Sequence, residues 1–195
     1  MRTSARVVTT LLTTTIVVAG TATAASAQAT TTKDRSGGVI TFANEQDEQG
    51  TQLSAADSAA SGLDIRSLKI DHGKKKVVVT LKFSRLGSDT ITSMAFRPNN
   101  KSQPNRILVN TGRKSGDVFN ARYQPKCGAT LKTKLGKNGY IKATIKRSCL
   151  GTPKKLRVSA AAFRSDATGN SISAIDTLSK GNPRSSVYTK AVKAG

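Results

Sequence analysis

The chain has 195 residues and a formal net charge of +21 at pH 7, from 32 Lys and Arg against 11 Asp and Glu. It has no Trp, one His and two Cys. This composition argues against a sugar site built on large aromatic platforms and against a metal centre rich in His or Cys. The positive charge is uneven, because residues 1–73 hold six basic residues against seven acids, whereas residues 74–195 hold 26 against four. Such a field attracts polyanions such as nucleic acid, teichoic-type wall polymers, anionic lipid or acidic polysaccharide, although charge can also serve solubility alone.

Residues 1–27 have the features of a secretory signal peptide. Arg2 and Arg6 precede a short apolar stretch rich in Thr, and Ala25-Ser26-Ala27 gives the small-residue cleavage pattern before Gln28. The apolar stretch is too short and too polar for a membrane span. We therefore expect a secreted, extracellular protein of 168 residues that starts at Gln28, with association to the cell wall as a further option.

Residues 28–62 are rich in Thr, Ala, Ser, Gln and Gly, which predicts a flexible linker with one short strand near Val39–Phe42. Acidic residues gather here and just beyond. Carboxylates are the ligands that Ca²⁺ prefers, so a calcium site is one interpretation. The spacing of these acids matches no calcium loop, so the other interpretation is that they are solvated loop residues. The acids are Glu45, Asp47, Glu48, Asp57 and Asp64.

The chain from residue 63 to residue 192 reads as short strands separated by turns. Apolar residues change register within Leu63–Ile70, which predicts a β-bulge, and Asp71–Lys74 is expected to be a turn that carries a solvated His72. No stretch has helical periodicity. The pattern predicts an all-β fold, a single antiparallel β-sandwich of about eight short strands with one disulfide. The expected strands include 75–84, 90–96, 106–110, 118–123, 156–160, 172–177 and 186–192.

Residues 125–153 have the pattern of a β-hairpin. Leu131, Thr133 and Leu135 alternate with lysines in the first arm, and Ile141, Ala143 and Ile145 do so in the second. This places apolar side chains on one face and lysines on the other, around a turn at Asn138-Gly139 that tolerates positive φ. Cys127 and Cys149 flank the hairpin, and we expect them to form a disulfide; two free buried thiols are the alternative.

The outward lysines of this hairpin form the candidate binding surface. Cations on one solvated face can contact phosphates without reading sequence. Tyr140 is the one aromatic residue placed to stack on a base, and single-strand binding would require more. The alternative is that exposed lysines only prevent edge-to-edge pairing of sheets. The candidate polyanion-binding residues are Lys132, Lys134, Lys142 and Lys146, extended by Lys155 and Arg157.

No motif for catalysis or for a cofactor is present. The sequence lacks a P-loop, a dinucleotide-binding glycine pattern, a nucleophile elbow, an HExxH pattern and an EF-hand. A carboxylate pair for glycoside hydrolysis could come from Asp64, Asp89, Asp117, Asp166 and Asp176, with nothing to favour any two. We therefore expect a protein that is not an enzyme and that uses no cofactor or metal.

Two segments carry a resemblance to known proteins. Gly62-Leu63-Asp64-Ile65 leads into the 77–83 strand, and Arg147-Ser148-Cys149-Leu150-Gly151, followed by Pro153, leads into the 156–158 strand. Together they resemble uncharacterised small secreted β-sandwich proteins of high-GC Gram-positive bacteria that carry an Arg-Ser-Cys-Leu-Gly segment. More remotely, they are similar to carbohydrate-binding sandwiches of the family 9 type. The resemblance implies a fold, and it carries over no binding residue because the Trp residues of those modules are missing.

These observations lead to one functional hypothesis and two alternatives. The hypothesis is an exported, non-enzymatic binding protein that holds an anionic polymer, with a wall polymer favoured, on its basic sheet face. One alternative is a lectin-like module that binds neutral glycan through its loops. The other is a secreted hydrolase or inhibitor.

Overall fold

The computed structural model describes residues 28–34, 37–44, 46–169, 171–179 and 186–195, and the predicted signal peptide lies outside them. The described chain is built almost entirely of strands, with one short α-helix, α1 (Ala55–Ala60), and one 3-10 helix, η1 (Arg147–Leu150). The strands are β1 (Gln28–Lys33), β2 (Ile40–Thr41), β3 (Thr51–Gln52), β4 (Ile65–His72), β5 (Lys76–Phe83), β6 (Arg85–Leu86), β7 (Ile91–Pro98), β8 (Asn105–Asn110), β9 (Ser115–Phe119), β10 (Pro125–Lys134), β11 (Gly136–Lys137), β12 (Tyr140–Lys146), β13 (Lys155–Ser165), β14 (Ile172–Thr177) and β15 (Val192–Lys193).

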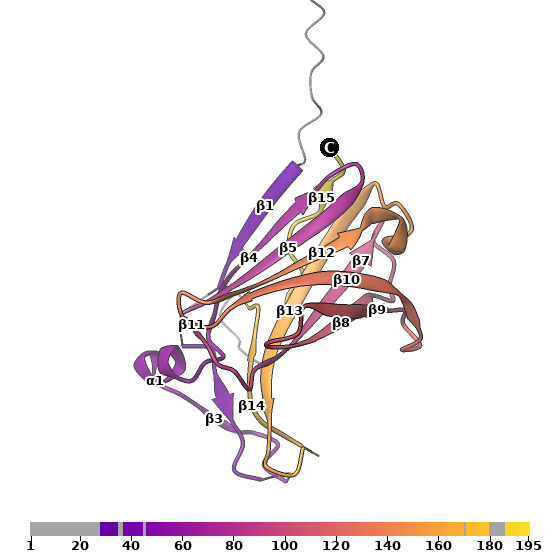
Figure 1. Cartoon of the computed structure of the whole chain (residues 1–195). Helices are drawn as coiled ribbons and strands as arrows, with labels where there is room; N and C mark the ends of the chain where they lie inside the picture. Colours follow the sequence, from indigo (N-terminus) through magenta and orange to yellow (C-terminus); the bar gives the residue numbers. More distant parts are fainter. Residues whose placement is uncertain (1–27, 35–36, 45, 170, 180–185) are drawn as a thin grey trace, which may run out of the picture.

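Most of these strands belong to one antiparallel sheet, in the order β1-β4-β5-β12-β10-β9-β8-β7-β13-β14-β2-β3, with β15 paired to β13. The sheet curls over on itself, so that β13 contacts β4 although the two are far apart in the strand order (Figure 1). β15 lies in the same region, against β1 and β4. The predicted all-β, antiparallel class is confirmed. The prediction expected a sandwich of about eight short strands. In the structure, two halves of one continuous sheet face each other across the core.

The core consists of the side chains on the inner face of this sheet. Val77, Val79 and Leu81 of β5 have no exposed surface, and Ile141 and Ile145 of β12 are equally buried. The alternation that predicted these strands is therefore confirmed. The predicted bulge is confirmed as well, since the pairing of β4 with β5 changes register between Ile65 and Ser67.

The prediction of a flexible linker over residues 28–62 is wrong. β1 pairs with β4 along its whole length, and Val39 and Ile40 are buried in or beside the core. β1 is an edge strand with both faces largely exposed, so its sequence needs no apolar alternation, and its threonines are β-branched residues that favour strands. α1 was not expected because six residues are too few to show a helical period; Ser54 caps it by accepting a hydrogen bond from the Asp57 N–H. The sheet therefore begins at Gln28.

The tip of the β10–β12 hairpin is held in a way that the sequence showed only in part. Gly139, expected to supply the positive φ of the turn, is not among the positive-φ residues; Asn138 has a φ of 51° and Gly136 one of 80°. Gly139 is required for a different reason, because a Cβ there would lie 2.5 Å from Leu86 Cβ. β11, in the tip, pairs with β6 in a separate two-stranded sheet. Leu135, expected on the apolar face, is 48% exposed because the chain turns immediately after it.

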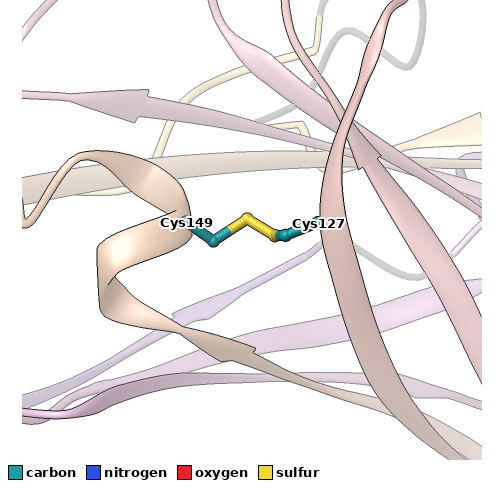
Figure 2. The surroundings of a disulfide bond; sticks show 2 residues. All are labelled: Cys127 and Cys149. Carbon is teal, nitrogen blue, oxygen red and sulfur yellow. A yellow bond between two sulfur atoms is a disulfide. The ribbon is translucent and has the colours of Figure 1, made fainter.

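The predicted disulfide joins Cys127 of β10 to Cys149 of η1, with the two Cα atoms 6.0 Å apart (Figure 2). The neighbouring Arg147 holds the same region, because its guanidinium donates to the backbone carbonyl oxygens of Lys74, Thr152 and Pro153. Gly151 ends η1 in the left-handed region, with a φ of 77°. The Arg-Ser-Cys-Leu-Gly segment therefore acts as a clip that fastens the end of β12 to β10 and to the turn before β5.

Removing the disulfide is expected to lower the free energy of unfolding by about 3 kcal/mol, because the bond closes a loop with a sequence separation of 22. The measurement is urea denaturation of the C127A/C149A variant and of the parent protein with and without reductant. The reduced parent should match the variant, and the variant should not respond to reductant. A parent protein whose midpoint is the same in both conditions would contradict this prediction.

Candidate polyanion-binding face

The outer face of four neighbouring strands, β4, β5, β12 and β10, carries the cations of the candidate site. Strand pairing places Lys132 directly opposite Lys142, and Lys142 opposite Thr80. In the next row, Lys134 lies opposite Tyr140, which lies opposite Lys82. Side chains directly opposite on one face of a sheet have Cβ atoms about 4.5–5.5 Å apart. The two rows therefore form a continuous patch with Tyr140 at its centre.

Two adjoining hollows follow this patch, with volumes of about 720 and 620 Å³. They share Arg66 and Asn138, and the second is bounded on one side by alanines of α1. We call the two hollows together the basic groove. Neither hollow has Asp or Glu in its lining, and their cations are Arg66, Lys82, Arg85, Lys132, Lys134, Lys137 and Lys142.

The positive charge of the basic groove is almost unneutralised within the described residues. One of its cations, Arg66, lies 3.8 Å from a carboxylate oxygen of the buried Asp64, and the other ion pairs of the described chain involve no residue of the groove. Like charges directly opposite each other on a sheet are destabilising, and Lys132 and Lys142 are such a pair. An anion bound in the groove would relieve this repulsion.

The structure brings together only part of the predicted binding surface. Lys132, Lys134 and Lys142 line the groove, whereas Lys146 lies at the other end of β12, opposite Lys76. Lys155 and Arg157 lie on β13, on the far side of β9, β8 and β7 in the strand order. Lys146 therefore shares the outer face of β12 with Lys142 but lies outside the groove, and the predicted extension of the same patch to Lys155 and Arg157 is corrected.

The sequence did not indicate that four further cations line the groove together with the hairpin lysines. They are Arg66, Lys82, Arg85 and Lys137. The alternation in β5 does indicate that Lys82 points outward. It does not indicate that β5 is the neighbour of β12. That information comes from the pairing of the strands.

The five acids considered for catalysis do not form a pair open to solvent. Asp89 pairs with Arg164 at 2.5 Å, Asp117 is exposed on β9, and Asp166 accepts hydrogen bonds from the hydroxyls of Thr168 and Ser171 in its own turn. The other two, Asp64 and Asp176, do come close, and both are fully buried.

Asp64 and Asp176 hold irregular backbone in place. Asp176 Oδ2 accepts a hydrogen bond of 2.6 Å from the Ile65 N–H. Asp64 accepts one of 3.2 Å from the Gly37 N–H and another from the Ser84 hydroxyl. Each carboxyl therefore provides a partner for a backbone donor that the sheet ladder does not use.

Burial raises the pKa of Asp176 from 3.8 to about 8, and the charges of Asp34 and Asp64 add to the increase, while the hydrogen bond from Ile65 opposes it. The carboxyl is therefore mostly protonated at neutral pH. Gly38 lies directly against it, since a Cβ at that position would meet Asp176 Oδ1 at 2.5 Å.

His72 is not in a solvated turn, as expected from the sequence, but is fully buried at the end of β4. Its Nδ1 lies 3.0 Å from the carbonyl oxygen of Val192, so the ring fastens β15 to β4. Burial lowers the pKa of His72, and the nearby Arg147 lowers it further, against the effect of the Val192 hydrogen bond. The lowered pKa favours the neutral ring, which packs the C-terminal strand β15 against β4.

The acids considered for calcium are dispersed. Asp47 accepts hydrogen bonds from the Ala43 and Gly50 N–H groups, Asp57 lies in the first turn of α1, and Glu45 is outside the described residues. No group of three or more His, Cys, Asp or Glu that could hold a metal ion occurs in the part of the chain that the structure describes. The predicted alternative of a calcium site gains no support from these positions.

The chain matches no protein family model, no curated protein and no solved structure. Among the described residues, neither helix has the length and apolar character that crossing a membrane requires.

Replacing Asp176 with Asn should make the protein less sensitive to alkaline pH. The folded protein keeps a proton on Asp176 that the unfolded chain releases, so its stability falls as the pH rises from about 4 to about 8. We expect the variant to lose less stability than the parent over this range, by on the order of a few kcal/mol. Thermal unfolding at pH 5 and pH 8.5 measures this, with the exposed Asp117→Asn as the matched control. Parallel pH profiles for the parent and D176N would contradict the assignment.

Proposed function

We propose that this is an exported, non-enzymatic binding protein that holds an anionic polymer, with a cell-wall polymer favoured, in the basic groove. The observation that carries the proposal is the groove itself, in which seven cations line adjoining hollows without a carboxylate. The predicted signal peptide supports an extracellular location for the proposed partner.

The layout of the cations favours a polymer over a small anion. They come from several neighbouring strands, and strands lie about 4.8 Å apart, so a chain laid across the face meets one charge after another. Lysines predominate, and a Lys ammonium is a point charge on a flexible stem that needs no fixed ligand geometry. Repeated phosphates or carboxylates along a flexible backbone suit such a surface.

The same layout favours a wall polymer over single-stranded nucleic acid. Binding of single strands combines a basic groove with aromatic rings on which successive bases stack. Tyr140 and Phe83 are the aromatic residues in the lining of the groove, and Phe83 is 2% exposed. Tyr140 alone offers little stacking surface.

Neutralising the three hairpin lysines should weaken retention of the protein on purified cell wall. The variant is K132Q/K134Q/K142Q, and the matched control is R113Q/R122Q/K126Q, which loses the same charge from exposed positions that do not line the groove. Retention is measured for both and for the parent along a salt gradient. Each phosphate contact that is lost lowers the slope of log affinity against log salt by about one, so the groove variant should lose about three.

Three outcomes would contradict the proposal. If the groove variant and the control weaken retention equally, the positive charge acts as a whole and the groove has no special role. If the parent binds with no dependence on salt, a lectin-like mode on neutral glycan replaces the proposed one. Tighter retention on DNA than on wall at physiological salt would reassign the partner to nucleic acid.

A further inference from the structure

A second cluster of cations lies on the outer face of β7 and β13, away from the basic groove. Arg97 and Arg157 are directly opposite each other in the antiparallel pairing of these strands. Lys155 lies two residues before Arg157 on β13, and it pairs with Lys193 of β15. Side chains two residues apart on a strand share a face, so all four cations point to the same side of the sheet.

The arginine pair, Arg97 and Arg157, has no acidic partner among the residues that the structure describes. Neither residue takes part in any of the ion pairs found within the described residues. The Arg97 guanidinium lies 4.0 Å from the centre of the Tyr188 ring, which fixes its plane against the sheet. Its Nε is buried and has no hydrogen-bond partner among the described residues. A donor that has lost its water without gaining a protein partner has more to gain from a bound anion than a hydrated lysine has.

Tyr188 and small residues of β7 and β13 lie beside the arginine pair. The next outward position on β13 is Ser159, which pairs with the small Ala95 of β7, and its hydroxyl lies 2.9 Å from the hydroxyl of Ser186. Arg157 is exposed, and Arg97 is half-buried beside it. Side chains directly opposite on one face of a sheet have Cβ atoms about 4.5–5.5 Å apart, which is close enough for both long side chains to reach one anion.

We propose that the arginine pair is a second anion site, independent of the basic groove, and that it takes a phosphate group. A guanidinium presents a rigid fork of donors that matches two oxygens of a phosphate, and two adjacent guanidinium groups can contact one tetrahedral anion from two sides. A carboxylate has only two oxygens in a plane and satisfies one fork. Lys155 and Lys193 add positive charge at the rim of the site.

The experiment follows the side-chain Nε–H signals of the arginines by NMR while inorganic phosphate is added at constant ionic strength. Saturable shifts are expected at Arg97 and Arg157 and not at Arg113 or Arg122, which lie in exposed positions. R157Q should bind phosphate about tenfold more weakly, because hydrogen bonds to a charged partner are lost. The R97K/R157K variant keeps both positive charges but lacks the guanidinium donors. It should also bind phosphate several-fold more weakly than the parent. Unchanged thermal unfolding midpoints verify that these variants fold.

The groove variant K132Q/K134Q/K142Q is the control that separates this proposal from the proposed function. It should bind inorganic phosphate at the arginine pair as the parent does, whatever its retention on cell wall. Linear shifts of equal size at all arginines would overturn the site. Parent-like affinity in R97K/R157K would overturn recognition by the arginine forks, and acetate binding as tight as phosphate binding would overturn the assignment to phosphate.

Discussion

The apolar face of the sheet has to be kept from water, and the described residues contain too little helix to cover it. Most of this face is therefore covered by another part of the same sheet. The sheet meets this requirement by curling until β13 contacts β4 (Figure 1). β15 pairs with β13 and also contacts β1 and β4. His72 secures the closure through the carbonyl of Val192, and the Cys127–Cys149 bond and Arg147 secure the neighbouring turn. The outer face, which faces water, is then free to carry charge.

That outer face has a composition that stability alone does not explain. Strand pairing puts Lys132 against Lys142 and Arg97 against Arg157, and like charges in such positions destabilise a sheet. A surface that served only to keep sheet edges apart would carry its lysines at the edges, but β12 and β10 lie inside the sheet. Bound anions offer a physical reason for both pairs.

The Arg-Ser-Cys-Leu-Gly segment consists of residues with structural roles. Cys149 forms the disulfide, Arg147 binds three carbonyl oxygens, Leu150 is buried and Gly151 has a positive φ. The segment thus fastens the fold, and the cations that could hold a ligand are the outward side chains of the neighbouring strands.

The sequence by itself determined the all-β class, the disulfide, a bulge within Leu63–Ile70, and the direction of the side chains in β5 and in the paired strands of the hairpin, β10 and β12. These features depend on period-2 alternation and on spacing along the chain. Only the tertiary structure decided which strands are neighbours. That choice depends on how the whole sheet curls to enclose its core, and no local pattern encodes it. It joined Arg66 and Lys82 to the hairpin lysines, separated Lys155 and Arg157 from them, placed Arg157 beside Arg97, and buried Asp64 and Asp176 together.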